Sequence, residues 1–319
     1  MVVANLVGPD VVICGAARAG TSFLASLLGS HPQIDPGAIK EPNFFSREYS
    51  RGFEWYDGLF RPRQSDLLRL DASTSYTYAH SHEALGKLAR QAPDALVVYS
   101  VREPLGRLLS HYHLNRNYFR NERAPSLGEA INGNDVYSGA SDYARWLTAL
   151  DELFPKGRVI VVPFNAVTER TQEVVDTACR ALDISSAPVE VQDGKSQQHR
   201  NEVVEFRHEI FRRIRRSVRR SGAYPLIRRT VGINRLRSLR IALTRTAETE
   251  TLSAALGSCD LPQLSRMDAL YRSAQSAAEV ALKEQDTRLG LEWAGLWSAS
   301  CPPTGLPTLL DELEARRDA

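Results

Sequence analysis

A glycine-flanked loop near the N-terminus has the residue types of an anion-binding site. Residues 15–22 read GAARAGTS and follow a short apolar run that begins at Val11. Two glycines five positions apart allow the backbone to wrap closely around an anion. A helix that begins at Thr21 would add N–H groups at its first turn, and the hydroxyls of Thr21 and Ser22 are further donors. The spacing therefore predicts a loop that holds a phosphate or sulfate group.

This loop differs from the phosphate loop of ATP-dependent kinases. Their GxxxxGK[ST] pattern places a lysine after the second glycine, whereas here Thr21 follows Gly20 directly. The cation of the loop is Arg18, and no strand-end aspartate of the magnesium-binding kind is evident. A lone arginine suits a transferring group with less charge than the γ-phosphate of ATP. A P-loop kinase acting on a small molecule and a glycine turn with an incidental arginine are the alternatives.

The hydrophobic pattern predicts an α/β fold with a P-loop-type parallel sheet flanked by helices. Continuously apolar strands are expected at 11–15, 68–72, 95–101 and 158–163, and helices at 21–28, 104–118, 143–154 and 168–182. Strands that are apolar throughout are covered on both faces. Ligands of such sheets bind beyond the carboxyl ends of the strands, so functional residues are expected just after these four runs.

A helical C-terminal lobe is expected to complete the same domain. Helical spacing of apolar residues marks 203–218, and a longer helix is predicted at 261–289. We therefore divide a single domain, 1–319, into an α/β core at 1–200 and a helical lobe at 201–319.

Two further groups of residues follow predicted strands or loops and could do chemistry. Glu41, next to Lys40, is a carboxylate that could remove a proton from an acceptor hydroxyl. Arg102 ends the strongest strand, and Ser110 lies eight residues later in the following helix. A guanidinium fork and a hydroxyl suit a phosphate group. The alternatives are an ordinary loop carboxylate for Glu41 and a salt-bridged strand end for Arg102.

Together these motifs resemble those of sulfotransferases that use 3′-phosphoadenosine 5′-phosphosulfate (PAPS), especially the heparan sulfate 3-O- and N-sulfotransferase branch. The resemblance covers about 11–200 and includes the loop, KEPNFF at 40–45, DASTSY at 71–76 and the Arg102–Ser110 spacing. It implies transfer of a sulfuryl group (EC 2.8.2 type) to a hydroxyl or amine of a glycan, lipid or secondary metabolite. The nucleotide product would be PAP, and no metal would be needed.

The resemblance also implies a role for each matching residue. The residues that would hold the 5′-phosphosulfate are Gly15, Ala17, Arg18, Ala19, Gly20, Thr21 and Ser22. Arg102 and Ser110 would bind the 3′-phosphate. Glu41 would be the catalytic base, while Arg18 and Lys40 would stabilise the leaving group or orient Glu41.

Other matches are looser. Lys195 and Arg200 fall where the family has a basic loop that closes over the nucleotide, and Phe44, Ser73 and His80 are expected on the acceptor side. Ala72 and Thr74 stand where the heparan branch has a lysine and a proline, so the acceptor is expected to differ.

Histidines provide an alternative base. His80, His82, His111 and His113 form two i,i+2 pairs, and one of them could replace Glu41. Metal binding is not expected, because no cluster of carboxylates or cysteines accompanies them. The four cysteines form no CxxC pair, which argues against a zinc ribbon or a disulfide-stapled domain.

Composition bounds the remaining possibilities. The chain has 319 residues, of which 43% are hydrophobic, and a net charge of +2, so it can bury a core and is not expected to be disordered. No apolar stretch is long enough for a membrane span and no secretory signal is evident, so a soluble, cytoplasmic protein of bacterial type is expected.

Charge is unevenly distributed along the chain. Residues 200–245 contain 14 arginines and carry +11, which leaves −9 for the rest. This segment predicts peripheral contact with a membrane or an acidic partner other than nucleic acid, or else a solvated helix. A non-catalytic protein that binds polyanions or membranes is therefore another alternative, and the oligomeric state is not predicted.

Overall fold

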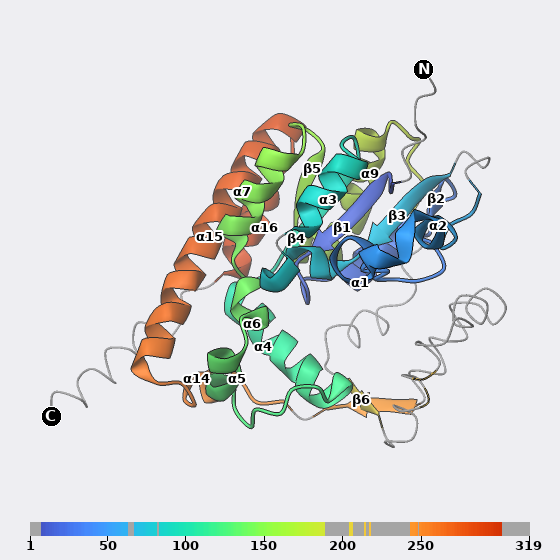
Figure 1. Ribbon diagram of the computed structural model, residues 1–319. Helices are drawn as coiled ribbons and strands as arrows, with labels where there is room; N and C mark the ends of the chain where they lie inside the picture. The colour runs from blue at the N-terminus through green and yellow to red at the C-terminus, as the bar shows by residue number, and fades with distance from the viewer. Residues whose placement is uncertain are drawn as a thin grey trace, which may run out of the picture.

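Five parallel strands form the centre of the part of the molecule that the computed structural model describes (Figure 1). The described residues are 8–62, 67–81, 83–188, 204–206, 214, 217, 243–247 and 249–301. In spatial order the strands are β2 (Ile34–Asp35), β3 (Leu68–Ala72), β1 (Val11–Gly15), β4 (Leu96–Val101) and β5 (Val159–Pro163). The central strand β1 is buried along its whole length, as its continuously apolar sequence requires.

The predicted P-loop-type parallel sheet with flanking helices is confirmed. Strands β1 and β3 have the predicted bounds, and β4 and β5 each begin one residue later than predicted. Strand β2 escaped prediction because two residues are too few to show a period.

Helices cover the sheet and extend from its ends. The longer ones are α1 (Thr21–Leu28), α3 (Ala84–Gln91), α4 (Pro104–His113), α7 (Tyr143–Leu153), α9 (Thr171–Leu182), α15 (Leu261–Leu289) and α16 (Trp293–Ser300). The shorter ones are α2 (Gly52–Asp57), α5 (Leu127–Gly133), α6 (Val136–Gly139), α8 (Phe164–Glu169) and α14 (Leu252–Leu256). Helical turns occur at η1 (Phe44–Glu48), η2 (Tyr49–Arg51), η3 (Thr74–Thr77), η4 (Ala79–Ser81) and η5 (Leu114–Phe119).

The C-terminal helices pack on the same core as the sheet. Helix α15 runs the length of the molecule and contacts α7, β5 and α16 (Figure 1). The side chain of Gln285 on α15 pairs with the backbone of Val161, accepting from its N–H at 2.8 Å and donating to its carbonyl at 2.9 Å. Gln285 thus satisfies backbone groups of β5, the last strand of this sheet, as exposed strand edges require.

The helical expectation for 203–218 is wrong at its start. Residues Val204–Phe206 form strand β6, which pairs antiparallel with β7 (Thr244–Thr246). Valine and threonine are β-branched and favour extended backbone, so cross-strand pairing prevails over the helical spacing there. The predicted helix at 168–182 is also divided, because α8 ends at Glu169 and α9 begins at Thr171.

The sheet register gathers the functional motifs at one edge. Strands β3 and β4 lie on either side of β1 and run parallel to it, with Val12 opposite Asp71 and Ile13 opposite Val98. Parallel strands end on the same side of a sheet. The loop after Gly15 therefore lies beside the segments that follow β3 and β4.

Gly15, the last residue of β1, tests this close packing. A Cβ at Gly15 would lie 2.2 Å from Oγ1 of Thr77 and 2.7 Å from the ring of Tyr99. We expect Gly15→Ala to lower the free energy of unfolding by about 1–3 kcal/mol through overpacking, measured by urea denaturation. The control is Gly295→Ala in α16, where a Cβ meets nothing within 4 Å and stability should be unchanged or raised. Equal stabilities of the two variants would contradict the close approach at Gly15.

Candidate active site

The loop 15–22 has its carbonyl oxygens bound by the protein behind it. Each carbonyl from residue 16 to residue 19 accepts a hydrogen bond. Ala19 N donates to Ala16 O at 3.1 Å, and Arg107 Nη1 donates to Ala17 O at 3.0 Å. Arg102 Nη1 donates to Arg18 O at 3.2 Å, and Ser100 Oγ donates to Ala19 O at 2.5 Å. Because carbonyl oxygens repel anions, tying them to protein donors prepares the loop for a negatively charged ligand.

The end of the loop leads into the N-terminus of α1. Gly20 has a φ of 85° and no side-chain cap follows it, so the first N–H groups of the helix carry its positive dipole end. A Cβ at Gly20 would approach the ring of Phe164 at 3.0 Å, which adds a second reason for glycine. Arg18 also adopts a left-handed backbone, with a φ of 71°.

Three residues singled out from the sequence meet around this loop. Nε of Arg18 donates to Oγ of Ser110 at 2.9 Å, and Arg102 donates to the carbonyl of Arg18. The guanidinium of Arg102 also lies 5.0 Å from the ring centre of Phe164. Burial lowers the pKa of Arg102, but a guanidinium stays protonated at any ordinary pH. Two cations and a hydroxyl, from the loop, β4 and α4, thus lie in one place.

Arg107 and Ser100 are functional candidates that the sequence did not reveal. Arg107 is completely buried on α4, and its Nε donates to Oγ of Ser141 at 2.6 Å. Its Nη2 donates to the carbonyl of Tyr137. The available signal was an arginine among leucines on a helix that packs inward, because arginine is seldom fully buried.

The predicted base stands at the end of the neighbouring strand β3. The backbone N–H of Glu41 donates to the carbonyl of Ala72 at 3.1 Å. Nζ of Lys40 lies 2.7 Å from Oε1 of Glu41, and both side chains are partly exposed. Glu41 has a φ of 60° and Asn43 a φ of 54°, so left-handed residues stand on either side of Pro42. This backbone turns a carboxylate and a paired ammonium out of the core.

A buried carboxylate supports that turn. Asp71 is fully buried and accepts hydrogen bonds from Ser73 Oγ (2.6 Å), Tyr76 OH (2.7 Å) and Tyr56 OH (2.8 Å). Burial raises the pKa of Asp71, while the three hydroxyl donors lower it. Oγ of Ser73 also accepts from the N–H of Asn43 at 3.0 Å.

The residues expected on the acceptor side therefore differ in burial. Ser73 is fully buried in the Asp71 network, and Phe44 is fully buried with its ring stacked on Tyr56 at 4.4 Å. Both support the Lys40–Asn43 turn from behind. His80 is exposed, with its ring 5.6 Å from that of Tyr78, and burial and the charge of Arg47 lower its pKa.

His111 is buried between the loop and the predicted acceptor side. Its Nδ1 lies 3.4 Å from Nη1 of Arg107, which is always a donor, so Nδ1 is the acceptor. Its Nε2 then carries the proton and faces the hydroxyl of Tyr78 at 3.5 Å. Burial holds the pKa of His111 well below its usual value, with further lowering from Arg107 and Arg18. A histidine held neutral in this way connects the two halves of the site.

Some predicted residues lie outside the described part of the chain. These are Lys195, Arg200, His82 and most of the arginine-rich segment 200–245.

Comparisons with known proteins identify the family of this chain. A family model for the sulfotransferase domain matches residues 8–218, more than half of the chain. The chain belongs to the sulfotransferase family. This is a family of enzymes, so the kinase and the non-catalytic alternatives are set aside.

Several individual sulfotransferases are similar to parts of this one. Membrane-associated sulfotransferase kil1 of Dictyostelium discoideum is 28% identical over 120 residues, covering 37% of this chain and 26% of that protein. Heparan sulfate glucosamine 3-O-sulfotransferase 6 of Mus musculus is 32% identical over 104 residues, covering 33% and 30%. The match thus spans less than a third of each of these relatives. A sulfotransferase crystal structure from Alicyclobacillus acidocaldarius shares 24% identity with a TM-score of 0.48, covering 60% of this chain and 89% of that one.

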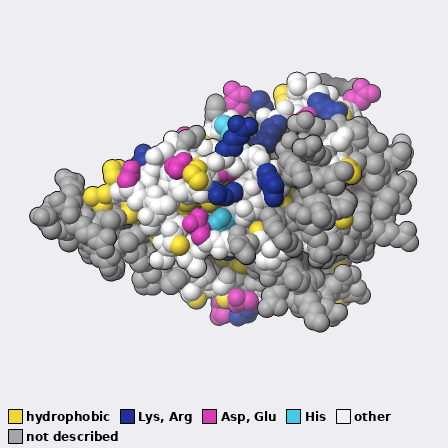
Figure 2. All heavy atoms as spheres, turned by 90° about the horizontal axis from the view of Figure 1, so that it is seen from below, with side chains coloured by type: hydrophobic (Ala, Val, Ile, Leu, Met, Phe, Trp, Pro, Cys, Tyr) yellow, Lys and Arg dark blue, Asp and Glu magenta, His cyan; other side chains and the backbone are white. Residues whose placement is uncertain are grey.

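One face of the described part of the molecule carries several basic side chains. Figure 2 shows lysine and arginine side chains gathered on the face seen from below Figure 1, with histidine and acidic side chains among them. Among the described residues, no group of three or more histidine, cysteine or carboxylate side chains is placed to hold a metal ion. In the same part of the chain, no helix combines the length and apolar character that crossing a membrane requires.

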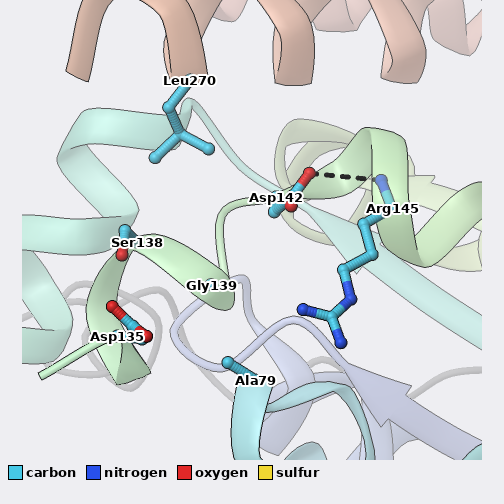
Figure 3. Close-up of a pocket in the computed structure, with 7 residues that line it drawn as sticks. All are labelled: Ala79, Asp135, Ser138, Gly139, Asp142, Arg145 and Leu270. Atoms are coloured by element: carbon cyan, nitrogen blue, oxygen red, sulfur yellow. Dashed lines mark hydrogen bonds between the residues drawn. The ribbon is translucent and has the colours of Figure 1, made fainter. Parts of the chain in front are cut away.

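A small pocket lies next to η4, beside Ala79. It is lined by Ala79, Asp135, Ser138, Gly139, Asp142, Arg145 and Leu270 (Figure 3). Asp142 accepts from the N–H of Arg145 at 3.2 Å and caps α7. The lining of the pocket carries both signs of charge, so the pocket differs from the basic loop site.

The buried His111 predicts a pH dependence of stability. Because its pKa is lower in the folded protein, the unfolded chain binds more protons below about pH 6.5, and stability falls as the pH is lowered through that value. We expect His111→Asn, whose Oδ1 can accept from Arg107, to lose less stability than the wild type between pH 8 and pH 5 in urea titrations. His80→Asn, at an exposed position, is the control and should follow the wild type more closely. Parallel curves for the wild type and His111→Asn would contradict the buried neutral histidine.

Proposed function

We propose that this sulfotransferase moves the sulfuryl group of PAPS to a hydroxyl or amine of an acceptor, with Glu41 as general base. The observation that carries the proposal is the convergence at one sheet edge of the anion loop, Arg102, Ser110 and the Lys40–Glu41 pair. PAPS would supply an activated sulfuryl group, with PAP as the leaving nucleotide.

The residues present fit such a donor. Positions 15 and 20 are glycines and have no room for a side chain. The protein binds the loop carbonyls, and Arg18 contributes a cation. The 5′ end of the nucleotide belongs at this loop and at residues 17–22. The 3′-phosphate belongs at Arg102 and Ser110, where the guanidinium and the hydroxyl are both within reach of Arg18.

The remaining chemistry falls to the acceptor side. An acceptor hydroxyl is a weak nucleophile, and the Glu41 carboxylate would take its proton as the new bond to sulfur forms. Lys40, paired with Glu41 at 2.7 Å, would orient the carboxylate. Arg18 and the N–H groups at the start of α1 would stabilise the charge that develops on the departing phosphate oxygen.

The acceptor class is proposed more broadly. The relatives named for heparan sulfate support a glycan, and a lipid is a second possibility. A secondary metabolite is the third possibility. Within the site, His80 is the predicted acceptor-side residue that lies exposed.

The base assignment predicts a separation of binding from turnover. Glu41→Gln should lower kcat by about 10²- to 10⁴-fold, because general base catalysis is lost, while PAP binding by calorimetry stays within about twofold of the wild type. Glu48→Gln, a carboxylate on the nearby turn η1 that pairs with Arg51, is the matched control and should leave both unchanged. Full activity of Glu41→Gln with any acceptor would exclude Glu41 as the base and point to a histidine.

The 3′-phosphate site predicts a nucleotide preference. Arg102→Ala should weaken PAP binding by about tenfold or more, the usual worth of a charged hydrogen bond, and should affect AMP, which lacks the 3′-phosphate, far less. Arg145→Ala removes another arginine that stacks on an aromatic ring, 4.8 Å from Trp146, and should affect neither ligand. Equal losses for PAP and AMP would remove Arg102 from this role.

A further inference from the structure

Arg107 is a buried cation whose hydrogen-bond acceptors among the described residues are all neutral. Its side chain has no exposed surface and donates to the carbonyls of Ala17 and Tyr137 and to the hydroxyl of Ser141. The fourth contact is Nδ1 of His111, which is also uncharged. Each of these bonds satisfies a donor, but none of them neutralises the charge.

The charges of Arg107 and Glu103 act on one another, but the Glu103 carboxylate is hydrogen-bonded elsewhere. Glu103 caps α4 by accepting from the N–H groups of Leu105 at 2.9 Å and Gly106 at 2.5 Å. In the described part of the chain, no carboxylate lies within 4.0 Å of a nitrogen of Arg107. Arg102 adds a like charge nearby, and burial and that charge both lower the pKa of Arg107. A buried charge without an ion-pair partner is costly.

The position of this charge indicates what would offset it. Nη1 of Arg107 touches the carbonyl of Ala17, in the middle of the loop that is proposed to hold the 5′ end of the nucleotide. A guanidinium directly behind an anion-binding loop raises the potential at the loop without contacting the ligand. The attraction between the Arg107 guanidinium and an anion on the loop is stronger than it would be in water, because the intervening protein screens it far less.

We propose that Arg107 is a positioning residue whose counter-ion is the 5′-phosphosulfate of the bound donor. The inference rests on the proposed function, because it requires a nucleotide with an anionic group on the loop. Arg107 holds the Ala17 carbonyl away from the ligand, and binding of the anion balances a charge that no carboxylate of the described residues pairs with. Donor binding and stability are thereby coupled.

The test compares two nucleotides that differ only at the 5′ position. PAP and adenosine 3′-phosphate share the 3′-phosphate, but only PAP places an anion on the loop. We expect Arg107→Gln to weaken PAP binding roughly tenfold or more, and adenosine 3′-phosphate binding by less than about threefold, measured by calorimetry. The increase in Tm that PAP produces should shrink in parallel, since it follows the affinity by mass action.

A second variant separates charge from shape. Arg107→Lys keeps the charge but loses the fork, so its melting temperature should fall while its ratio of PAP to adenosine 3′-phosphate affinity stays near that of the wild type. This variant decides the matter if Arg107→Gln does not fold. Equal losses for both nucleotides in Arg107→Gln, unchanged PAP affinity in that variant, or a collapsed ratio in Arg107→Lys would overturn the proposal. Failure of the wild type to bind PAP would instead refute the proposed function.

Discussion

The removal of carbonyl oxygens from the anion loop is the constraint on which the site depends. A loop that wraps an anion brings carbonyls as well as N–H groups close to it, and the carbonyls must be bound elsewhere. Here Arg107, Arg102 and Ser100 bind three successive carbonyls, and they come from β4, the residue directly after it and the start of α4. The loop after β1 can therefore take its shape only if β4 is its neighbour in the sheet, as the strand order provides.

The acceptor side depends on a different buried charge. Left-handed backbone at Glu41 and Asn43 is unfavourable for residues with side chains, by about 1 kcal/mol or more each, although asparagine tolerates it best. The turn persists because Asn43 is held from two directions: its N–H by Ser73, and its Oδ1 by the hydroxyl of Ser75 at 2.6 Å. Asp71 anchors Ser73 from inside the core. The proposed base is thus positioned by a network that reaches back into β3.

The sequence predicted the parts of this arrangement that have a period or a spacing. Glycines five apart and an arginine eight residues before a serine are local patterns, and parallel pairing brings them together without further information. The roles of Ser73 and Phe44 could not be read in this way. Nearness to a strand end does not say whether a side chain turns toward the ligand or the core, and both turn inward. Arg107 was missed for the opposite reason, since a charge on a helix is usually solvated.

The end of β3 differs in sequence from the heparan branch that the motifs resemble, because Ala72 stands where that branch has a lysine. Ala72 ends β3 and is buried, and its carbonyl receives the N–H of Glu41. A lysine at this position would have to leave the core to reach a ligand, and the turn beneath Glu41 would have to open with it. In this protein a cation beside the proposed base comes from the segment after β2, because Lys40 pairs with Glu41. The Lys40–Glu41 pair thus brings positive charge to the turn beside this strand end, while the strand end itself supports the proposed base through the Ala72 carbonyl.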